Sequence, residues 1–376
     1  MFKLITISLF LILSPFVFSK NIESIDAHFN IPKSFLFRDK TPEKVLISYL
    51  SYATPGSRVY MTFYQLGSKD VFNAIKGAAK RKVNFNIIMD DSSYRDAYKE
   101  ITNKLKSLLK PNQITVCSKP SCRNNYGNNH NKFFLFEHVT MPSGKEVEYV
   151  SIQTSHNFKF SQEFNYNDML VFKNNTQVYN AFLSYWEDLK SEEPIADYMS
   201  TKRGSVITSD KFTTSLYFSP SLDKDPFLDA LRDFDCGPTG KVLIAQSFFK
   251  GLRGQKTMEH LKEIRNRSPQ CKIELILRNN KHHNPFKKRL IKANFKVFVV
   301  NRLLRLGVGV HAKILLLENS LGEKLIFTGS MNLKDDSLSE NEEVLLSVKS
   351  DELFAKYLVF WEAMKPNSLR FEKPEL

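Results

Sequence analysis

The apolar positions of this chain form short continuous runs and helical spacings that alternate in the same order in each half. Residues 58–64 form a β-prone apolar run in the first half, and residues 241–247 do the same in the second. Helical spacing follows both runs, and another short apolar run follows each helix, at 85–89 and 273–277. The pattern predicts strand, helix and strand in succession, twice.

The later part of each half repeats in the same way. Continuous apolar runs at 133–136 and 314–317 predict buried strands, and each half ends in an aromatic helical segment. These helices carry the only two tryptophans of the chain, Trp186 and Trp361, which are 175 positions apart and which we interpret as core anchors. Strands alternating with helices predict an α/β fold with mixed, partly parallel sheets.

The repetition also predicts the domain organisation. We expect an N-terminal half at 20–190 and a C-terminal half at 212–376, joined by a polar linker at 191–211.

The first 19 residues are interpreted as a signal peptide. Lys3 precedes an apolar stretch that ends at Ser19 with the small residues that a signal peptidase requires. A buried helix or a membrane anchor is the alternative, but the run is short for a bilayer span of about 20 residues. We therefore expect cleavage near Ser19 and a secreted or periplasmic protein.

Composition and charge narrow the class of ligand. The 376 residues are 42% hydrophobic and 25% charged, which is ordinary for a soluble globular protein and excludes fibrous and disordered classes. The formal net charge of +14 creates a positive field that attracts phosphates, nucleic acid or anionic membranes. Charge alone does not distinguish among these partners.

The four cysteines predict two disulfides, because their number is even and the chain is expected in an oxidising compartment. Cys117 and Cys122 flank a short loop, whereas Cys236 and Cys271 each precede a predicted strand. Of the three possible pairings we favour Cys117 with Cys122 and Cys236 with Cys271. A zinc site is disfavoured, since no histidine or C-x2-C spacing accompanies the cysteines.

The candidate chemistry lies at matching positions of the repeat. The pattern H-x-K-x4-E occurs twice, as His130, Lys132 and Glu137 and as His311, Lys313 and Glu318. Along a strand, residues i and i+2 point to the same side, so each histidine projects together with its lysine. A single H-x-K carries little weight, but two copies in register favour function over chance.

An S-x-N pattern and then an acid follow each motif at the same distance. The sets are Ser155, Asn157 and Asp168 in the first half and Ser330, Asn332 and Glu343 in the second. Ammonium, amide and hydroxyl donors can stabilise the negative charge that builds on a phosphodiester under attack. A carboxylate behind each imidazole would fix its tautomer, and we expect Asp168 and Glu343 to do this.

With these motifs the sequence resembles the phospholipase D superfamily, whose defining feature is a doubled H-x-K-x4-D with a following G-S-x-N. The resemblance covers nearly the whole chain after the first 20 residues. It implies a two-lobed αβαβα sandwich in which both motifs meet at a pseudo-twofold axis and form one active site. It also implies a covalent phosphohistidine intermediate and no requirement for a metal or other cofactor. By that resemblance His130 is the nucleophile and His311 the general acid, although the near symmetry leaves their order open.

The chain departs from the family pattern in two ways. Glu137 and Glu318 replace the usual aspartate, which affects only a supporting contact. Thr154 replaces the glycine expected in the first of the two G-S-x-N motifs. His138 and His156 have no counterparts in the second half, so we place both outside catalysis. Several basic residues lie near the second motif, where they either form a solvated surface or bind an anionic substrate: Lys281, His282, His283, Arg302 and Arg305.

Three functions are compatible with these residues. A secreted phospholipase D would hydrolyse phospholipid headgroup esters to phosphatidic acid, whereas a metal-independent endonuclease would use the same histidines on DNA or RNA. A degenerate binding protein is disfavoured, because both sets of polar residues are intact. We favour a phospholipid membrane surface over nucleic acid as the partner, since exported nucleases of the superfamily typically carry one motif per chain. A monomer is expected, because one chain already holds both half-sites.

Overall fold

A computed structural model describes residues 23–34, 37–94, 96–208, 212–278, 284–300 and 307–371. The predicted signal peptide at 1–19 lies outside these ranges, as do residues 209–211 of the predicted linker and the basic residues at 281–283, 302 and 305. Among the helices in these ranges, none has the length and apolar character needed to cross a bilayer.

The first sheet is built from the first half of the chain, with one short exception. Its strands are β1 (Ser24–Asn30), β2 (Arg58–Phe63), β3 (Asn84–Met89), β4 (Ile114–Val116), β5 (Phe133–Thr140), β6 (Glu146–Thr154), β7 (Asn165–Lys173) and β13 (Gly309–Val310). Their order is β1-β7-β6-β5-β2-β3-β4, and β13, from the second half, pairs with β7. The strands β2, β3 and β4 run parallel, and the remaining pairs within the first half are antiparallel.

The second sheet repeats this plan. Its strands are β8 (Ser205–Thr208), β9 (Thr213–Phe218), β10 (Lys241–Gln246), β11 (Lys272–Arg278), β12 (Lys296–Val300), β14 (Lys313–Glu318), β15 (Lys324–Gly329), β16 (Val344–Lys349) and β17 (Ser368–Phe371). Their order is β17-β12-β11-β10-β14-β15-β16-β9-β8, with β10, β11 and β12 parallel. The sheets are mixed and partly parallel, as the sequence predicts. Strand β8 lies within the segment 191–211.

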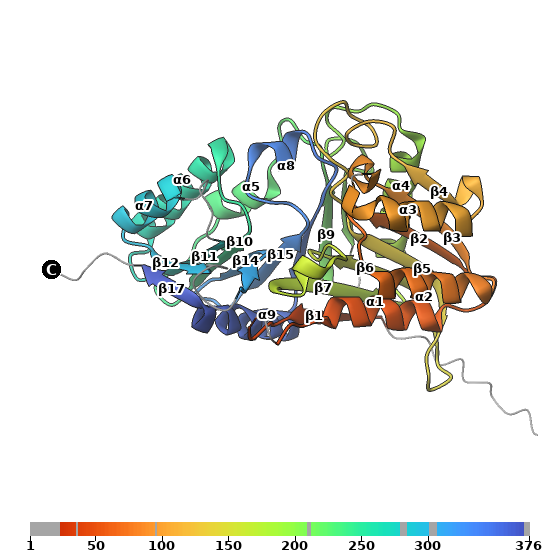
Figure 1. Cartoon of the computed structure of the whole chain (residues 1–376). Coiled ribbons are helices and arrows are strands. Elements are labelled where there is room, and N and C mark those ends of the chain that lie inside the picture. The colour runs from red at the N-terminus through yellow and green to blue at the C-terminus, as the bar shows by residue number, and fades with distance from the viewer. Residues whose placement is uncertain are drawn as a thin grey trace, which may run out of the picture.

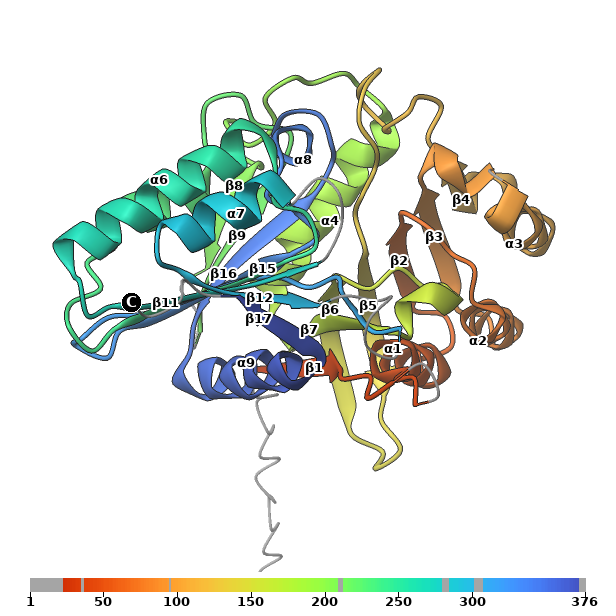
Figure 2. The same cartoon turned by 60° about the vertical axis from the view of Figure 1, so that its left-hand side comes forward.

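The helices form layers outside and between the two sheets (Figures 1 and 2). They are α1 (Thr41–Tyr52), α2 (Lys69–Lys80), α3 (Asp96–Leu108), α4 (Thr176–Ser191), α5 (Pro226–Arg232), α6 (Gly251–Arg267), α7 (Asn284–Lys292), α8 (Asp335–Ser339) and α9 (Asp351–Met364), with 3-10 turns η1 (Asp91–Tyr94), η2 (Pro111–Gln113), η3 (Phe160–Gln162) and η4 (Lys365–Asn367). Helices α4 and α9 contact strands of both sheets and so lie between them. The architecture is the αβαβα sandwich with two repeated lobes.

Three hydrophobic clusters fill the spaces between these layers. The central cluster contains Trp186 from α4 and Trp361 from α9, so both tryptophans are core residues, as expected. In β5, Phe133 packs into the central cluster and Phe134 into the outer cluster of the first lobe. A strand covered on both faces needs apolar side chains on both, which explains the continuous apolar runs.

Both predicted disulfides are present. Cys117 is bonded to Cys122 in the loop before β5, and Cys236 is bonded to Cys271, which directly precedes β11. All four cysteines are buried. The first disulfide lies in the first lobe near the contact between the halves, and the second lies in the core of the second lobe.

Candidate active site between the two halves

The two motif histidines line one cavity of about 340 Å³. His130 precedes β5 and His311 precedes β14, so each lies at the start of a strand whose apolar residues are anchored in the core. Asn157 and Asn332 line the same cavity. The structure therefore brings the two motifs, which are far apart in the sequence, into one site at the contact between the lobes.

Each histidine is held by backbone hydrogen bonds to the opposite half of the chain. The His311 amide donates to the Tyr166 carbonyl on β7 at 3.0 Å, beside the short parallel pair of β13 and β7. In return, the His130 amide donates to the Glu342 carbonyl at 2.9 Å, and the Glu342 amide donates to Asn128 at 3.0 Å. These reciprocal contacts fix the separation and orientation of the two histidines.

A carboxylate supports the imidazole of His130. Nδ1 of His130 lies 2.7 Å from Oε2 of Glu343, and both side chains are buried. Burial acts to raise the pKa of Glu343, but the charges of His130 and Lys132 and the hydrogen bonds from His130 and Asn341 together outweigh it and lower that pKa to about 2. Burial lowers the pKa of His130 to about 4. At neutral pH an anionic Glu343 therefore accepts a hydrogen bond from Nδ1–H, and Nε2 carries the unprotonated lone pair.

Two uncharged oxygens, rather than a carboxylate, accept from the imidazole of His311. Its Nδ1 lies 2.9 Å from the Ser155 carbonyl oxygen, 3.2 Å from Oδ1 of Asn167 and 3.3 Å from Nζ of Lys313. The two oxygens are the nearer neighbours and only accept, so this nitrogen also carries a proton. Burial, followed by the charges of Lys313 and Lys132, lowers the pKa of His311 well below its usual value.

The prediction that Asp168 supports an imidazole is wrong. The Asp168 carboxylate is buried and accepts hydrogen bonds from Ser155 at 2.6 Å, from Tyr357 at 2.9 Å and from Thr328. None of its hydrogen bonds goes to His311. Its neighbour Asn167 occupies that place, because adjacent residues of a strand point to opposite faces and only one faces the imidazole. Asp168 instead joins β6, β15 and α9 across the two halves.

The motif lysines are buried and point back toward their histidines. Nζ of Lys132 donates to the His130 carbonyl at 2.5 Å and lies 4.9 Å from the centre of the Tyr64 ring. Nζ of Lys313 donates to the His311 carbonyl. Burial lowers the pKa of Lys132 well below its usual value and that of Lys313 to about 7. An anion bound between the halves would favour the charged form of both lysines.

The S-x-N residues divide into two groups. Oδ1 of Asn157 and Oδ1 of Asn332 are buried without a hydrogen-bond partner in the protein, and both side chains line the cavity. An amide oxygen only accepts, so a ligand could pair with these two atoms through a donor group, whereas phosphate oxygens would pair with the amide nitrogens. Ser155 and Ser330 differ from the expectation that they donate to phosphate: Ser330 accepts from the Val344 amide at 3.1 Å, and Ser155 accepts from the Asp168 amide at 3.0 Å. Their hydroxyls continue the pairing of neighbouring strands.

The acids that end the two motifs lie away from the cavity. Glu137 pairs with Arg58 at 2.5 Å and Glu318 pairs with Lys241 at 2.6 Å. Each pair joins the motif strand to the neighbouring strand of its sheet, so these acids have equivalent structural contacts. The glutamates extend one methylene beyond aspartate and reach their basic partners across the strand pair.

The two halves also differ at the first residue of G-S-x-N. Gly329 has φ +150°, and a Cβ there would lie 2.2 Å from the Val344 carbonyl oxygen, so glycine is required. In the first half Thr154 donates from its hydroxyl to the equivalent Asp168 carbonyl at 2.7 Å. In the first half, the Thr154 hydroxyl therefore forms a hydrogen bond with the carbonyl whose counterpart in the second half, that of Val344, leaves no room for a side chain at Gly329.

Sequence reasoning missed several residues of the site. Asn167 and Glu342 each directly precede a predicted acid, and no pattern in one sequence separates a residue facing the imidazole from its neighbour. Lys159 and Lys334 line the cavity and are 175 positions apart, so the repeat itself could have identified them. His156 is buried, contacts Phe158 and lies outside the cavity lining.

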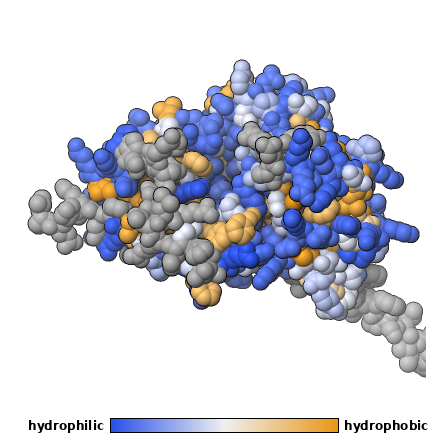
Figure 3. Space-filling view, in the orientation of Figure 1, coloured by the Kyte–Doolittle hydropathy of each residue, from blue (hydrophilic) through white to orange (hydrophobic). Residues whose placement is uncertain are grey.

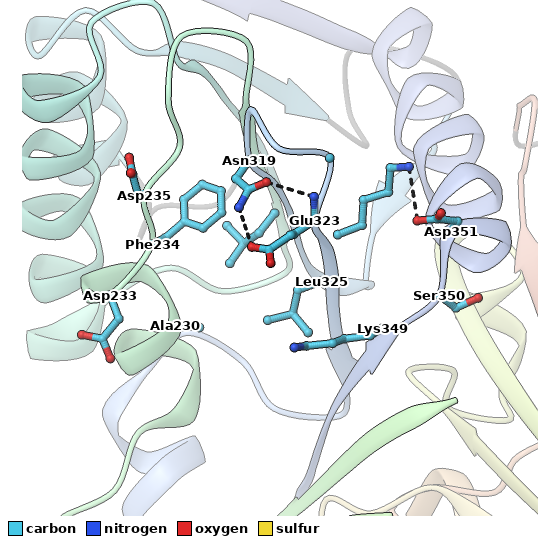
Figure 4. Close-up of a pocket in the computed structure, with 13 residues that line it drawn as sticks. Ala230, Asp233, Phe234, Asp235, Asn319, Glu323, Leu325, Lys349, Ser350 and Asp351 are labelled. Atoms are coloured by element: carbon cyan, nitrogen blue, oxygen red, sulfur yellow. Dashed lines mark hydrogen bonds and ion pairs between the residues drawn. The ribbon is translucent and has the colours of Figure 1, made fainter. Parts of the chain in front are cut away.

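A larger cavity of about 660 Å³ lies in the second lobe and contains none of the histidines, lysines or asparagines of the motifs (Figure 4). Some of its polar groups are paired with each other, since Lys324 pairs with Asp351 at 3.2 Å and Asn319 donates to Glu323 at 2.6 Å. Within the described ranges, no group of three or more histidine, cysteine, aspartate or glutamate side chains could hold a metal ion.

Comparisons with known proteins identify the family. The model of the family described as "Cardiolipin synthase, PLD-like domain" matches residues 46–189 and 238–364, once in each lobe. A search of curated proteins gave no match.

Solved structures show the same fold. A phosphatidylserine synthase of Haemophilus influenzae is similar with a TM-score of 0.65 at 10% identity, over 93% of this chain and 87% of that one. A polyphosphate kinase of Porphyromonas gingivalis is similar with a TM-score of 0.56 at 12% identity, over 91% of this chain, which spans 50% of the kinase. At these identities the likeness shows the fold alone. With the family match in both lobes, the chain belongs to the PLD-like domain family and thereby to the phospholipase D superfamily of phosphodiester-acting enzymes.

Proposed function

We propose that this protein is a phosphodiesterase of phospholipase D type that hydrolyses phospholipid headgroup esters to phosphatidic acid through a phosphohistidine on His130. The observation that carries this proposal is the 2.7 Å contact between His130 and Glu343 beside a cavity that His311 also lines. A carboxylate behind an imidazole stabilises the positive charge that accumulates on the ring when Nε2 attacks phosphorus.

In the first step, Nε2 of His130 bonds to phosphorus and the headgroup oxygen leaves with a proton from Nε2 of His311. Burial and two lysines keep His311 neutral in the free site, so the negative charge of the bound phosphodiester would have to raise its pKa. Lys132, Lys313 and the side-chain NH2 groups of Asn157 and Asn332 would donate hydrogen bonds to the remaining phosphate oxygens and so stabilise their charge.

In the second step, Nε2 of His311 takes a proton from water and the resulting hydroxide attacks phosphorus. The bond between phosphorus and His130 breaks, and phosphatidic acid is released with both histidines restored. All groups in these two steps are side chains of one chain, which supports a monomeric enzyme that needs no metal or other cofactor.

The test is hydrolysis by purified protein in the presence of EDTA, with labelled phosphatidylcholine vesicles and, separately, with plasmid DNA. The proposal expects release of headgroup and formation of phosphatidic acid. Nicked DNA with intact lipid would show instead that the chain is a metal-independent endonuclease. Loss of both activities in EDTA, with recovery on addition of a divalent cation, would contradict the two-histidine mechanism.

We also propose export of the protein after cleavage near Ser19, and the domain boundaries 20–190, 191–211 and 212–376. Two buried disulfides support an oxidising location, because the cytosol keeps thiols reduced. The N-terminal sequence of the protein recovered from the medium or the periplasm tests the cleavage site.

A further inference from the structure

Several of the large apolar side chains that are exposed lie next to the residues that line the active-site cavity. Phe160 is 62% exposed and stands between Lys159 and Ser161, which both line it. Tyr126, 74% exposed, lies two residues before the lining residue Asn128, on the side of the cavity where the chain contacts the second half. Phe160 and Tyr126 are therefore exposed neighbours of cavity-lining residues on two different segments.

Two more exposed apolar residues extend this surface. Phe37, 68% exposed, belongs to a turn that packs on η3, since the next residue, Arg38, lies over the Phe160 ring at 5.5 Å and pairs with Glu163 at 3.1 Å. Leu252, 58% exposed, is the second residue of α6, and its amide donates to Asp335, which follows the lining residue Lys334. We call Phe37, Tyr126, Phe160 and Leu252 the mouth surface.

The surroundings of the mouth surface are basic. Lys159 lies at the cavity, and its Nζ donates to Gln65 at 2.6 Å and to Tyr98 at 3.1 Å, both uncharged groups. Its positive charge is therefore not neutralised by a carboxylate contact. Arg38 is about half exposed but is paired with Glu163, so the positive field comes from Lys159 and from the net charge of +14 of the whole chain. In the space-filling view, a hydrophobic patch lies near the middle of the face between the two lobes, with hydrophilic side chains around it (Figure 3).

Exposed apolar side chains framed by cations match the interface of an anionic bilayer, where apolar groups enter the acyl boundary and cations meet the headgroups. Single-stranded nucleic acid also binds aromatic and basic residues, but it needs open ring faces for stacking. One face of Phe160 is occupied by Arg38, and the edge-to-face neighbour Phe164 lies 5.1 Å from it. Leu252 has no ring. The bilayer fits this surface better.

We propose that the mouth surface docks the protein onto an anionic phospholipid bilayer, so that a lipid headgroup enters the cavity directly from the membrane. This inference rests on the lipid substrate proposed above. It adds the partner and the residues that hold it, and these residues are distinct from the groups that carry the chemistry.

The test measures vesicle binding by sedimentation with the His130→Asn protein, which does not consume lipid. Vesicles contain either equal parts of phosphatidylcholine and phosphatidylglycerol or phosphatidylcholine alone. We expect Phe37→Ala with Phe160→Ala to weaken binding to the anionic vesicles about 10- to 100-fold, since two aromatic side chains no longer leave water. Neutral vesicles should bind more weakly than anionic ones to the parent protein.

A matched control uses two apolar residues that are at least as exposed but do not adjoin the cavity lining. Leu321 in the β14–β15 turn is 87% exposed and Val359 on α9 is 69% exposed. Leu321→Ala with Val359→Ala should change vesicle binding less than about twofold. Thermal melts check that both double variants fold as the parent does.

A fluorescent readout tests insertion directly. In Phe160→Trp, emission should shift to the blue when anionic vesicles are added, because the new indole enters the bilayer. Trp186 and Trp361 are buried and should not respond.

The outcomes separate this inference from the proposed function. Vesicle binding that depends on Phe37 and Phe160 without lipid hydrolysis would support the surface and contradict the lipid substrate. Hydrolysis of vesicle lipid with unchanged binding by the double variant would overturn the surface and leave the function intact. If the same variant loses binding to single-stranded DNA but not to vesicles, the surface is a nucleic-acid surface and the inference is wrong.

Discussion

The two histidines come from the same motif, yet their surroundings differ. His130 is backed by the carboxylate of Glu343 at 2.7 Å, whereas His311 is backed by the Ser155 carbonyl and the amide oxygen of Asn167. An acid follows S-x-N at the same sequence distance in each half, but in the sheet pairing Asp168 corresponds to Val344 and is engaged by three hydroxyl groups instead.

This difference suggests how one duplicated motif supports two roles. A carboxylate makes an imidazole a better nucleophile and stabilises its cation, while neutral partners leave the imidazolium a stronger acid. We therefore assign attack to His130 and proton transfer to His311 on the basis of their partners. The predictions below test that division, from the largest expected effect to the smallest.

Replacing either histidine should reduce steady-state turnover by about 10⁴-fold or more, because nucleophilic and acid-base roles are lost. The two variants should differ in the first turnover. With bis(p-nitrophenyl) phosphate, whose leaving group needs no acid, His311→Ala should release about one equivalent of p-nitrophenol and then stop. His130→Ala should give no burst. A burst from His130→Ala alone would reverse the assignment.

Removing the carboxylate of Glu343 should lower kcat more than removing the amide of Asn167. Glu343→Gln is expected to lower kcat by about 10²- to 10⁴-fold, since the imidazole loses both its fixed tautomer and its stabilised cation. Asn167→Ala should lower kcat about tenfold, because the Ser155 carbonyl still accepts a hydrogen bond from Nδ1 of His311. Asp168→Asn serves as the control and should lower the melting temperature more than it changes kcat. Equal losses in the first two variants would remove the basis for distinguishing the histidines.

The two disulfides should affect different properties. Cys122 and Arg123 donate backbone hydrogen bonds at 3.0 and 2.8 Å to the carboxylate of Glu342, the residue before Glu343. Loss of the Cys117–Cys122 bond should therefore disturb the support of His130.

Replacing Cys117 and Cys122 by serine should lower kcat about tenfold, the size expected for a loosened catalytic geometry. Replacing Cys236 and Cys271 should leave kcat nearly unchanged but destabilise the fold more, because that bond closes a segment of 35 residues rather than 5. Loop-closure entropy gives about 4 against about 2 kcal/mol. Enzyme assays and chemical denaturation measure the two effects, and equal changes in kcat would show that the first loop does not support the site.

The smallest effect is a shift of the pH profile. The free-enzyme pKa of His130 is lowered to about 4 by burial, so the acidic limb of kcat/KM should lie near pH 4, with activity lost as pH falls and the nucleophile is protonated. The charge of Glu343 opposes this lowering, so Glu343→Gln should move the limb to more acidic pH. An acidic limb that stays in place in this variant would show that another group controls it.

Much of the fold can be predicted from local sequence patterns. Apolar runs covered on both faces, such as 133–136, predict buried strands, and side-chain caps reinforce the repeat: Asn175 caps α4 and Ser350 caps α9, again 175 positions apart. Strands and helix caps can be predicted from the sequence because they depend on residues that are close together in the chain. The pairing of β13 with β7 was not predictable, because a two-residue strand has no periodicity.

The sequence by itself determined the repeated α/β plan and the residue types of the site, because periodicity and a repeated motif are properties of the chain alone. It favoured, among three possible pairings, the two disulfides that the structure contains. Only the tertiary structure decided that Glu343 contacts His130 while Asn167 takes the place expected of Asp168. It also decided that Ser155 and Ser330 face neighbouring strands rather than the cavity. Those choices depend on which face of a strand meets which neighbour from the other half, and such long-range packing leaves no signal in a single sequence.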